Sequence, residues 1–323
     1  MKTIRLLSMA CLLMATMPTK ADLAPTVMLH RGELVKTYMY YEVQKAVDDA
    51  QDGDTIFLSE GSFQPFNVNK RILVRGAGPS TIINGNCIIN ISGTDKLKMP
   101  VLDALFFNGD IQVDNAYKQF TLRKCSMNSL IFNGEKHYDV KVDRCYFGNR
   151  LNLSNNVVEF NAFNSRIATL YPHDYSGHAT FEHCNISEIC DTIQGGIFNS
   201  CAIYCCSKLS GAKYATDLIG CVLNSCAYYC YYDAPYKGTD NGDGISGDNC
   251  SFINCMKVGG KTNINYSNAN AISALDGTKI GAYGGQHPFN LNPEVPGVTN
   301  HQISIDAATR TMTVTLTVDK LDK

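Results

Sequence analysis

Apolar residues recur along the chain in short rows spaced near 20 residues apart. In six rows a cysteine lies between a residue three positions earlier and an apolar residue two positions later, and two further rows have leucine or asparagine in the cysteine's place. The rows start between 16 and 29 residues apart. They are Leu102-Leu105-Phe107, Leu122-Cys125-Met127, Val142-Cys145-Phe147, Val158-Asn161-Phe163, Phe181-Cys184-Ile186, Phe198-Cys201-Ile203, Leu218-Cys221-Leu223 and Gly247-Cys250-Phe252.

A repeat of this length, with insertions between strands, is typical of a solenoid in which each coil contributes short stacked strands. Residues two apart in a strand lie on the same face, so the cysteine position and the position two after it should point inward. The residue three positions before the row centre should also point into the coil, from the other side of a bend in the chain. We therefore predict an all-β chain that coils as a parallel β-solenoid.

The sequence has 14 cysteines, a number that in an exported chain usually indicates a disulfide framework. Their place in the rows favours another interpretation. Free cysteine behaves as a small buried hydrophobe, and side chains in neighbouring rungs point in parallel, which disulfide geometry disfavours. We predict a column of mostly unbridged thiols inside the coil.

Before the rows, Val43, Ala46, Val47 and Ala50 form the apolar stripe of a short amphipathic helix. Gly53 follows, and Thr55-Ile56-Phe57-Leu58 reads as a strand. The stretch VQKAVDDAQDGDTIFLSEGSF and the later ILVRGAGPSTIINGN resemble the N-terminal cap and first coils of right-handed parallel β-helices, the pectate-lyase-like superfamily. The resemblance covers about 45 residues. It implies a right-handed parallel β-helix with a short N-terminal capping helix.

The same resemblance implies contact with polysaccharide. Enzymes of that fold include lyases in which Ca²⁺ neutralises a substrate carboxylate while a base removes the neighbouring proton, and glycosidases with paired carboxylates. This sequence lacks the Arg-x-Pro-x-x-Arg stretch and strand-end acids of the lyases, and the Asp-Asp pair and Gly-His-Gly segment of the polygalacturonase type. No catalytic residue is carried over. Asparagines 108, 128, 164 and 224, three positions after the row centre, resemble the family's internal asparagine ladder at one bend.

The chain ends suggest export and an appended element. Residues 1–21 combine a basic start, an apolar run and a small-x-small cleavage pattern, which predicts a secretory signal peptide. Residues 22–270 then form the β-helix domain, and residues 271–323 form a linker and a C-terminal β-hairpin. Alternating Ile303 and Ile305, and then Met312 to Val318, predict the two hairpin strands, which we expect to pack on the solenoid.

Two insertions, near 170–177 and 231–244, follow their row centres at similar distances. They should leave the same side of the coil three rungs apart and flank a groove. Aromatic rings can stack on sugars while carboxylates and amides bind hydroxyl groups, although the same tyrosines would also serve to pack the loops. The candidate binding residues are Tyr171, His173 and Asp174 in the first insertion and Tyr231, Tyr232, Asp233 and Tyr236 in the second.

Two further groups carry charge. Asp240 and Asp243 lie in a glycine-containing turn with the oxygen ligands that Ca²⁺ prefers, but the motif is incomplete and a solvated turn is the alternative. Ca²⁺ is thus the one candidate cofactor. Arg150 and Arg166 occupy the same position after their row centres, so we expect them to stack in adjacent rungs. Such a pair could bind a uronate carboxylate, and a surface pair with Asp or Glu partners elsewhere is the alternative.

Net charge is −2 without a block of like charges, which argues against a nucleic-acid-binding face, and no segment after the signal peptide is long and apolar enough to span a membrane. The leading hypothesis is an exported, monomeric β-helix protein, periplasmic, secreted or at the cell surface, that binds acidic or neutral polysaccharide without turnover. A divergent polysaccharide lyase or glycosidase and a purely structural or adhesive solenoid are the alternatives.

Overall fold

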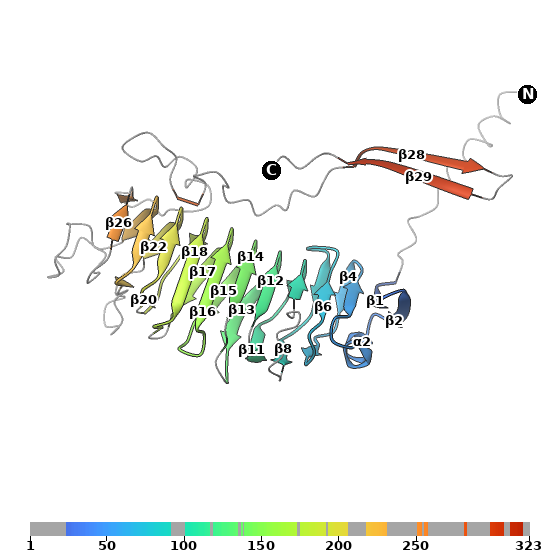
Figure 1. Cartoon of the computed structure of the whole chain (residues 1–323), viewed down its shortest axis with the longest axis horizontal. Coiled ribbons are helices and arrows are strands. Elements are labelled where there is room, and N and C mark those ends of the chain that lie inside the picture. The colour runs from blue at the N-terminus through green and yellow to red at the C-terminus, as the bar shows by residue number, and fades with distance from the viewer. Residues whose placement is uncertain are drawn as a thin grey trace, which may run out of the picture.

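The computed structural model is a parallel β-solenoid whose short strands stack into two long sheets (Figure 1). The structure describes residues 24–91, 101–116, 119–134, 137, 139–172, 175–191, 193–205, 218–230, 251–253, 255–257, 281–282, 298–306 and 311–318. The all-β solenoid predicted from the rows is confirmed. Its right-handed sense stays a prediction, and the predicted signal peptide lies outside the described residues.

Sheet A holds 12 strands, all parallel after the first two. In spatial order they are β2 (Leu34–Met39), β1 (Thr26–Arg31), β3 (Thr55–Leu58), β6 (Leu73–Arg75), β9 (Val101–Asp103), β12 (Phe120–Arg123), β14 (Val140–Asp143), β16 (Glu159–Phe163), β18 (His178–Glu182), β21 (Ile197–Asn199), β24 (Val222–Asn224) and β26 (Ser251–Ile253).

Sheet B holds 13 parallel strands and forms a second side of the coil. Its main path is β27 (Met256–Lys257), β25 (Ala227–Cys230), β22 (Ala202–Cys205), β19 (Asn185–Ile186), β17 (Arg166–Tyr171), β15 (Tyr146–Asn152), β13 (Ser126–Phe132), β10 (Phe106–Phe107), β7 (Thr81–Ile83) and β4 (Gly61–Phe63), with β11 (Ile111–Ala116), β8 (Cys87–Ile91) and β5 (Asn67–Val68) alongside. A third, two-stranded sheet pairs β20 (Ile193–Gln194) with β23 (Leu218–Ile219).

At the N-terminal end, the predicted amphipathic helix is present as α2 (Val43–Asp49). Its predicted stripe is buried, with Val43, Ala46 and Val47 fully inside the core. Gly53 has the expected positive φ, +93°, but it does not end the helix, because α2 ends at Asp49 with an extended C-cap at Ala50. Strands β1 and β2, which the hydrophobic pattern does not predict, extend sheet A: β1 pairs antiparallel with β3, and β2 pairs antiparallel with β1. The role of the helix as the cap of the solenoid stays a prediction.

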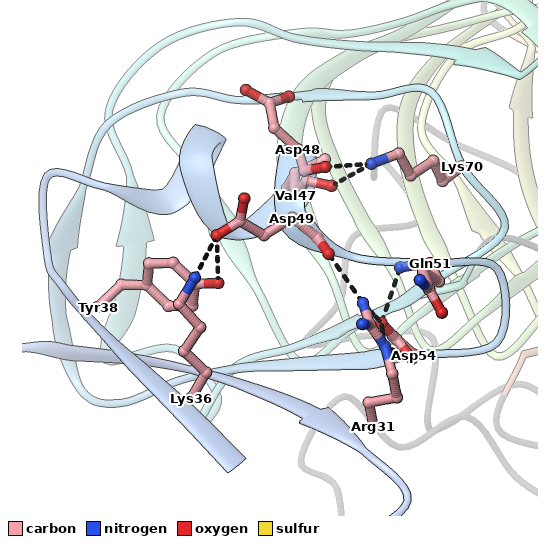
Figure 2. A network of polar contacts seen from close by, with 9 residues as sticks. All are labelled: Arg31, Lys36, Tyr38, Val47, Asp48, Asp49, Gln51, Asp54 and Lys70. Atoms are coloured by element: carbon pink, nitrogen blue, oxygen red, sulfur yellow. Dashed lines mark hydrogen bonds and ion pairs between the residues drawn. The ribbon is translucent and has the colours of Figure 1, made fainter. Parts of the chain in front are cut away.

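Salt bridges connect strands β1 and β2 to the last residue of α2 and to the turn after it (Figure 2). Arg31 donates from Nη2 to Oδ2 of the buried Asp54 at 2.8 Å, and Asp49 accepts from Lys36 Nζ at 2.5 Å and from the Tyr38 hydroxyl at 2.8 Å. Lys70 donates to the carbonyl groups of Val47 and Asp48. These contacts fix α2 against β1 and β2.

The strand register confirms five of the eight predicted rows and corrects three. Leu122 lies between Leu102 and Val142, and Phe181 lies beside Phe198, as predicted. Val142 lies beside Ala162, however, rather than Val158, and Phe198 lies beside Leu223 rather than Leu218. Since Leu223 in turn lies beside Phe252, the corrected row centres are Ser165, Cys226 and Cys255.

In the seven rows where it is described, the residue before the row centre adopts a left-handed conformation, with φ between 46° and 55°, and turns the chain from sheet A into sheet B. Its N–H donates to a carbonyl group of the next rung, as from Lys124 to Asp143 at 2.8 Å. The column consists of Ala104, Lys124, Arg144, Asn164, His183, Ser200 and Ser225. The predicted internal asparagine ladder is wrong. Asn164 lies at this bend, whereas Asn224 is the last residue of β24 in sheet A. Asn128 is exposed in β13, and Asn108 is exposed directly after β10.

The nine cysteines whose side chains the structure describes are free, which confirms the predicted unbridged thiols for these positions. Each row-centre thiol donates to backbone carbonyl groups at the bend, as Cys201 does to Phe181 and Asn199, both at 3.3 Å. Cys226 Sγ accepts from the Cys201 N–H at 3.4 Å. Ser165 takes the same role with its hydroxyl group, which donates to Phe163 and accepts from the Cys145 N–H.

Strands β28 (Val298–Asp306) and β29 (Thr311–Val318) pair antiparallel, with Ile303 opposite Val314 and Ile305 opposite Met312. The alternating pattern thus predicted both strands. Residues 307–310, in which the predicted turn falls, lie outside the described residues. The packing of this hairpin on the solenoid stays a prediction.

Candidate binding surface on sheet B

Three of the predicted site residues lie in the described part of the chain, all on strands β15 and β17. These are Arg150, Arg166 and Tyr171. The others lie outside the described residues: His173, Asp174, Tyr231, Tyr232, Asp233, Tyr236, Asp240 and Asp243. The predicted groove and the predicted Ca²⁺ turn therefore stay predictions.

Each of the two predicted site arginines lies over a tyrosine ring of the neighbouring strand. The guanidinium carbon of Arg150 is 5.6 Å from the centroid of the Tyr171 ring, and that of Arg166 is 5.3 Å from the Tyr146 ring. Both distances are within the range of a cation–π interaction. We call these four residues the Arg–Tyr surface.

The predicted stacking of the two arginines is wrong. Arg150 lies beside Ser129 and Thr169 in the sheet register, whereas Arg166 lies beside Tyr146 and Asn185. The error has one cause: the centre of the fourth row is Ser165 and not Asn161. Arg166 thus follows its row centre by one residue, while Arg150 follows Cys145 by five.

A β-bulge in β15 exposes Arg150. Three residues separate the buried Phe147 from the buried Leu151, whereas two separate Met127 from Leu130 in β13 and Ile167 from Leu170 in β17. The extra residue leaves positions 148, 149 and 150 exposed in succession. Bulges re-aim side chains and are frequent beside functional sites.

Polar groups border the surface. The Thr169 hydroxyl donates to Glu188 Oε2 at 3.1 Å, and the Asn149 amide donates to the Ser129 hydroxyl at 3.4 Å. Flat aromatic rings, two planar cations and amide or hydroxyl groups together can bind a sugar ring, its hydroxyl groups and an acidic substituent. Guanidinium groups bind carboxylates through two parallel hydrogen bonds.

The strands that lead into the two predicted insertions belong to the same sheet. Strand β17 ends at Tyr171 and β25 ends at Cys230, and β19 and β22 lie between them. They are three strand spacings apart, or about 14 Å at roughly 4.8 Å per strand. The strands that precede the two insertions thus have the predicted separation of three rungs.

Other titratable groups in the described chain have structural surroundings. His137 is fully buried, its Nε2 donates to the Asn133 carbonyl at 2.8 Å, and burial lowers the pKa of the imidazole, which keeps it neutral. Asp103 accepts bonds from Arg75 and Arg123. Burial alone would raise the pKa of Asp103, but the bonds from the two guanidinium groups hold it below its usual range.

Within the described ranges, no three His, Cys, Asp or Glu side chains come together as a metal site would require. No helix in the same part of the chain has both the length and the apolar character needed to cross a bilayer.

Tyr146 is the member of the surface that the sequence did not reveal. Its position directly after Cys145 matches that of Arg166 after Ser165. The match is not visible in the sequence, because Ser165 stands at a row centre where the neighbouring rows have cysteine.

Comparisons of the chain with protein-family models, curated proteins and solved structures find no match. The solenoid fold is therefore shown by the structure alone, and membership of the pectate-lyase-like superfamily stays a prediction.

Proposed function

We propose that the protein is exported and binds an acidic polysaccharide through the Arg–Tyr surface, without turnover. The observation that carries this proposal is the pairing of two arginines with two tyrosines across adjacent strands. A guanidinium group can bind an anion through its N–H groups while its face lies over an aromatic ring, and an aromatic ring also offers an apolar face to a sugar.

The rigidity of the support favours binding over a merely solvated pair of cations. Strands β15 and β17 are held in register from Tyr146 to Asn152, and their inward residues Phe147, Leu151 and Leu170 are fully buried. Side chains on such a support lose little further freedom when a ligand binds, which lowers the entropic cost of association.

The test is affinity electrophoresis of the mature chain from Asp22 in gels that contain polygalacturonate, alginate or a neutral glucan. We expect retardation by an acidic polymer and less or none by the neutral one. The double variant Arg150→Gln/Arg166→Gln should lose most of this retardation, because each charge-assisted contact contributes about 1.5–3 kcal/mol.

A charge-matched control separates the surface from net charge. Lys45→Gln/Lys141→Gln also removes two positive charges, but from exposed positions on α2 and β14. The ion pairs of these two lysines contribute little to the free energy of unfolding. The control should bind like the parent chain. Equal loss in both double variants, or no retardation by any acidic polymer, would refute the proposal. Release of unsaturated uronates or reducing ends would show turnover and favour the lyase or glycosidase alternative.

A further inference from the structure

The sheet register separates the two cations along the strands. Arg150 lies opposite Thr169, three residues further along β17 than Arg166. At about 3.3 Å per residue and about 4.8 Å between strands, the two backbone positions are roughly 11 Å apart.

The aromatic contacts increase this separation. Arg150 extends toward Tyr171, which lies two residues beyond Thr169 on β17. Arg166 extends toward Tyr146, the residue directly beside it on β15. Each guanidinium group therefore approaches the tyrosine farther from the other arginine. A single carboxylate cannot contact two cations held this far apart.

Resting on the proposed function, we propose that the Arg–Tyr surface is a two-point site for a linear oligouronate. The chain of sugars lies along strands β15 and β17, across the axis of the solenoid. One carboxylate binds Arg166 beside Tyr146, and a carboxylate on a non-adjacent sugar binds Arg150 beside Tyr171. The bulge in β15 serves this site, because it exposes the Arg150 side chain at the distance that a longer ligand spans.

A two-point site predicts a step in affinity with ligand length. A ligand too short to reach both cations binds at one point only. A ligand that reaches both gains the effective concentration of the second contact, which raises affinity by about 10²–10⁴-fold. Monogalacturonate and digalacturonate should therefore bind weakly, and the step should come at trigalacturonate or tetragalacturonate.

The experiment is calorimetric titration of the mature chain with galacturonate oligomers of one to six units, and with the methyl-esterified hexamer. We expect a step of at least about 100-fold for the parent chain and no binding of the ester. Arg150→Gln and Arg166→Gln should each remove the step, so that the hexamer binds about as weakly as the dimer. The Lys45→Gln/Lys141→Gln control should keep it.

A relocated cation tests the spacing itself. Arg150→Gln/Ala168→Arg places the second cation on β17, two residues or about 7 Å from Arg166. The step should then move to a shorter oligomer. A smooth rise of affinity with length in the parent chain, or a step unchanged in both single variants, would overturn the two-point site while leaving acidic-glycan binding intact. Failure of every oligomer, together with failure of the polymer gels, would overturn both.

Discussion

Replacing Asp103 by Asn should destabilise the solenoid markedly at neutral pH. The Asp103 side chain, on β9, is 7% exposed and joins three rungs of sheet A. Its carboxylate accepts from Arg75 Nε at 2.8 Å and from Arg123 Nε and Nη2 at 3.0 and 2.8 Å. Asparagine keeps the volume but removes the charge and one of the two acceptor oxygens.

The magnitude follows from these contacts. Removing one partner of a buried ion pair costs about 3–5 kcal/mol when the remaining charge stays buried. Here both arginine side chains are 40% exposed, so water can solvate the guanidinium groups after the change. We therefore expect a loss of about 2–3 kcal/mol in the free energy of unfolding, from lost charge-assisted hydrogen bonds at about 1.5–3 kcal/mol each. At roughly 2 °C per kcal/mol for a chain of this size, Tm should fall by about 5 °C.

The pH dependence has a defined sign. The pKa of Asp103 is depressed in the folded chain, so its contribution to stability is present above the unfolded pKa of about 3.9 and is lost as pH falls through the folded pKa. The Tm difference between parent and Asp103→Asn should be equal at pH 7 and pH 5 and should shrink toward pH 3.

Thermal unfolding followed by circular dichroism at these three pH values is the assay. Asp143→Asn is the matched control, because that carboxylate is 28% exposed, forms an ion pair with the partly exposed Arg144 at 3.2 Å and interacts with Arg123 only through charge; its loss should cost under about 1 kcal/mol. Equal Tm values for Asp103→Asn and Asp143→Asn at pH 7, or a deficit that does not shrink at pH 3, would refute this account of the ion pairs.

Three further predictions test the coil itself. Thiol titration of the unfolded chain from Asp22 onward should count at least nine free thiols, the number described as unbridged, and a lower count would contradict the thiol column. Gly109→Ala should cost about 1–3 kcal/mol, because the added carbon would lie 2.6 Å from the Gly85 carbonyl group, whereas Gly32→Ala, in open space, should cost less in the same melting assay. Lys124→Val should lower Tm while Lys124→Asn should not, because the left-handed bend tolerates Asn and disfavours β-branched residues; equal Tm values would refute that strain.

The sequence predicted the interior of the solenoid far better than its surface. Inward positions are under one constraint, since each must fill the coil beside the residue in the next rung, and rows such as Leu122-Cys125-Met127 show it directly. The helix from Val43 and the strand from Thr55 were predictable for the same reason, because one face of each is buried. Strand β2 was not predicted: most of its residues are exposed and impose no hydrophobic period.

The register errors also have a physical origin. Cys221 and Cys226 are both fully buried, five residues apart, so burial alone does not reveal which of them stands at the bend. The left-handed residue before the row centre would have distinguished them, but that column holds lysine, arginine, histidine, serine and alanine as well as asparagine. Backbone hydrogen bonds between rungs fix the left-handed conformation of this residue, so its position cannot be recognised from a particular residue type.

The candidate surface lies where the repeat is least regular, and the two facts have one explanation. The inward residues repeat from rung to rung because every rung must fill the same interior. A rung that follows the repeat therefore gives no indication of a ligand site. The rung of Ser165 departs from the thiol column, and the rung before it carries the extra residue of the bulge. Those two rungs present the Arg–Tyr surface. A buried serine can replace cysteine here because its hydroxyl makes the same bonds at the bend, and the bulge is tolerated because Leu151 returns to the core directly after it. The coil thus keeps its interior while the outer face of β15 and β17 is free to take the residues that binding requires.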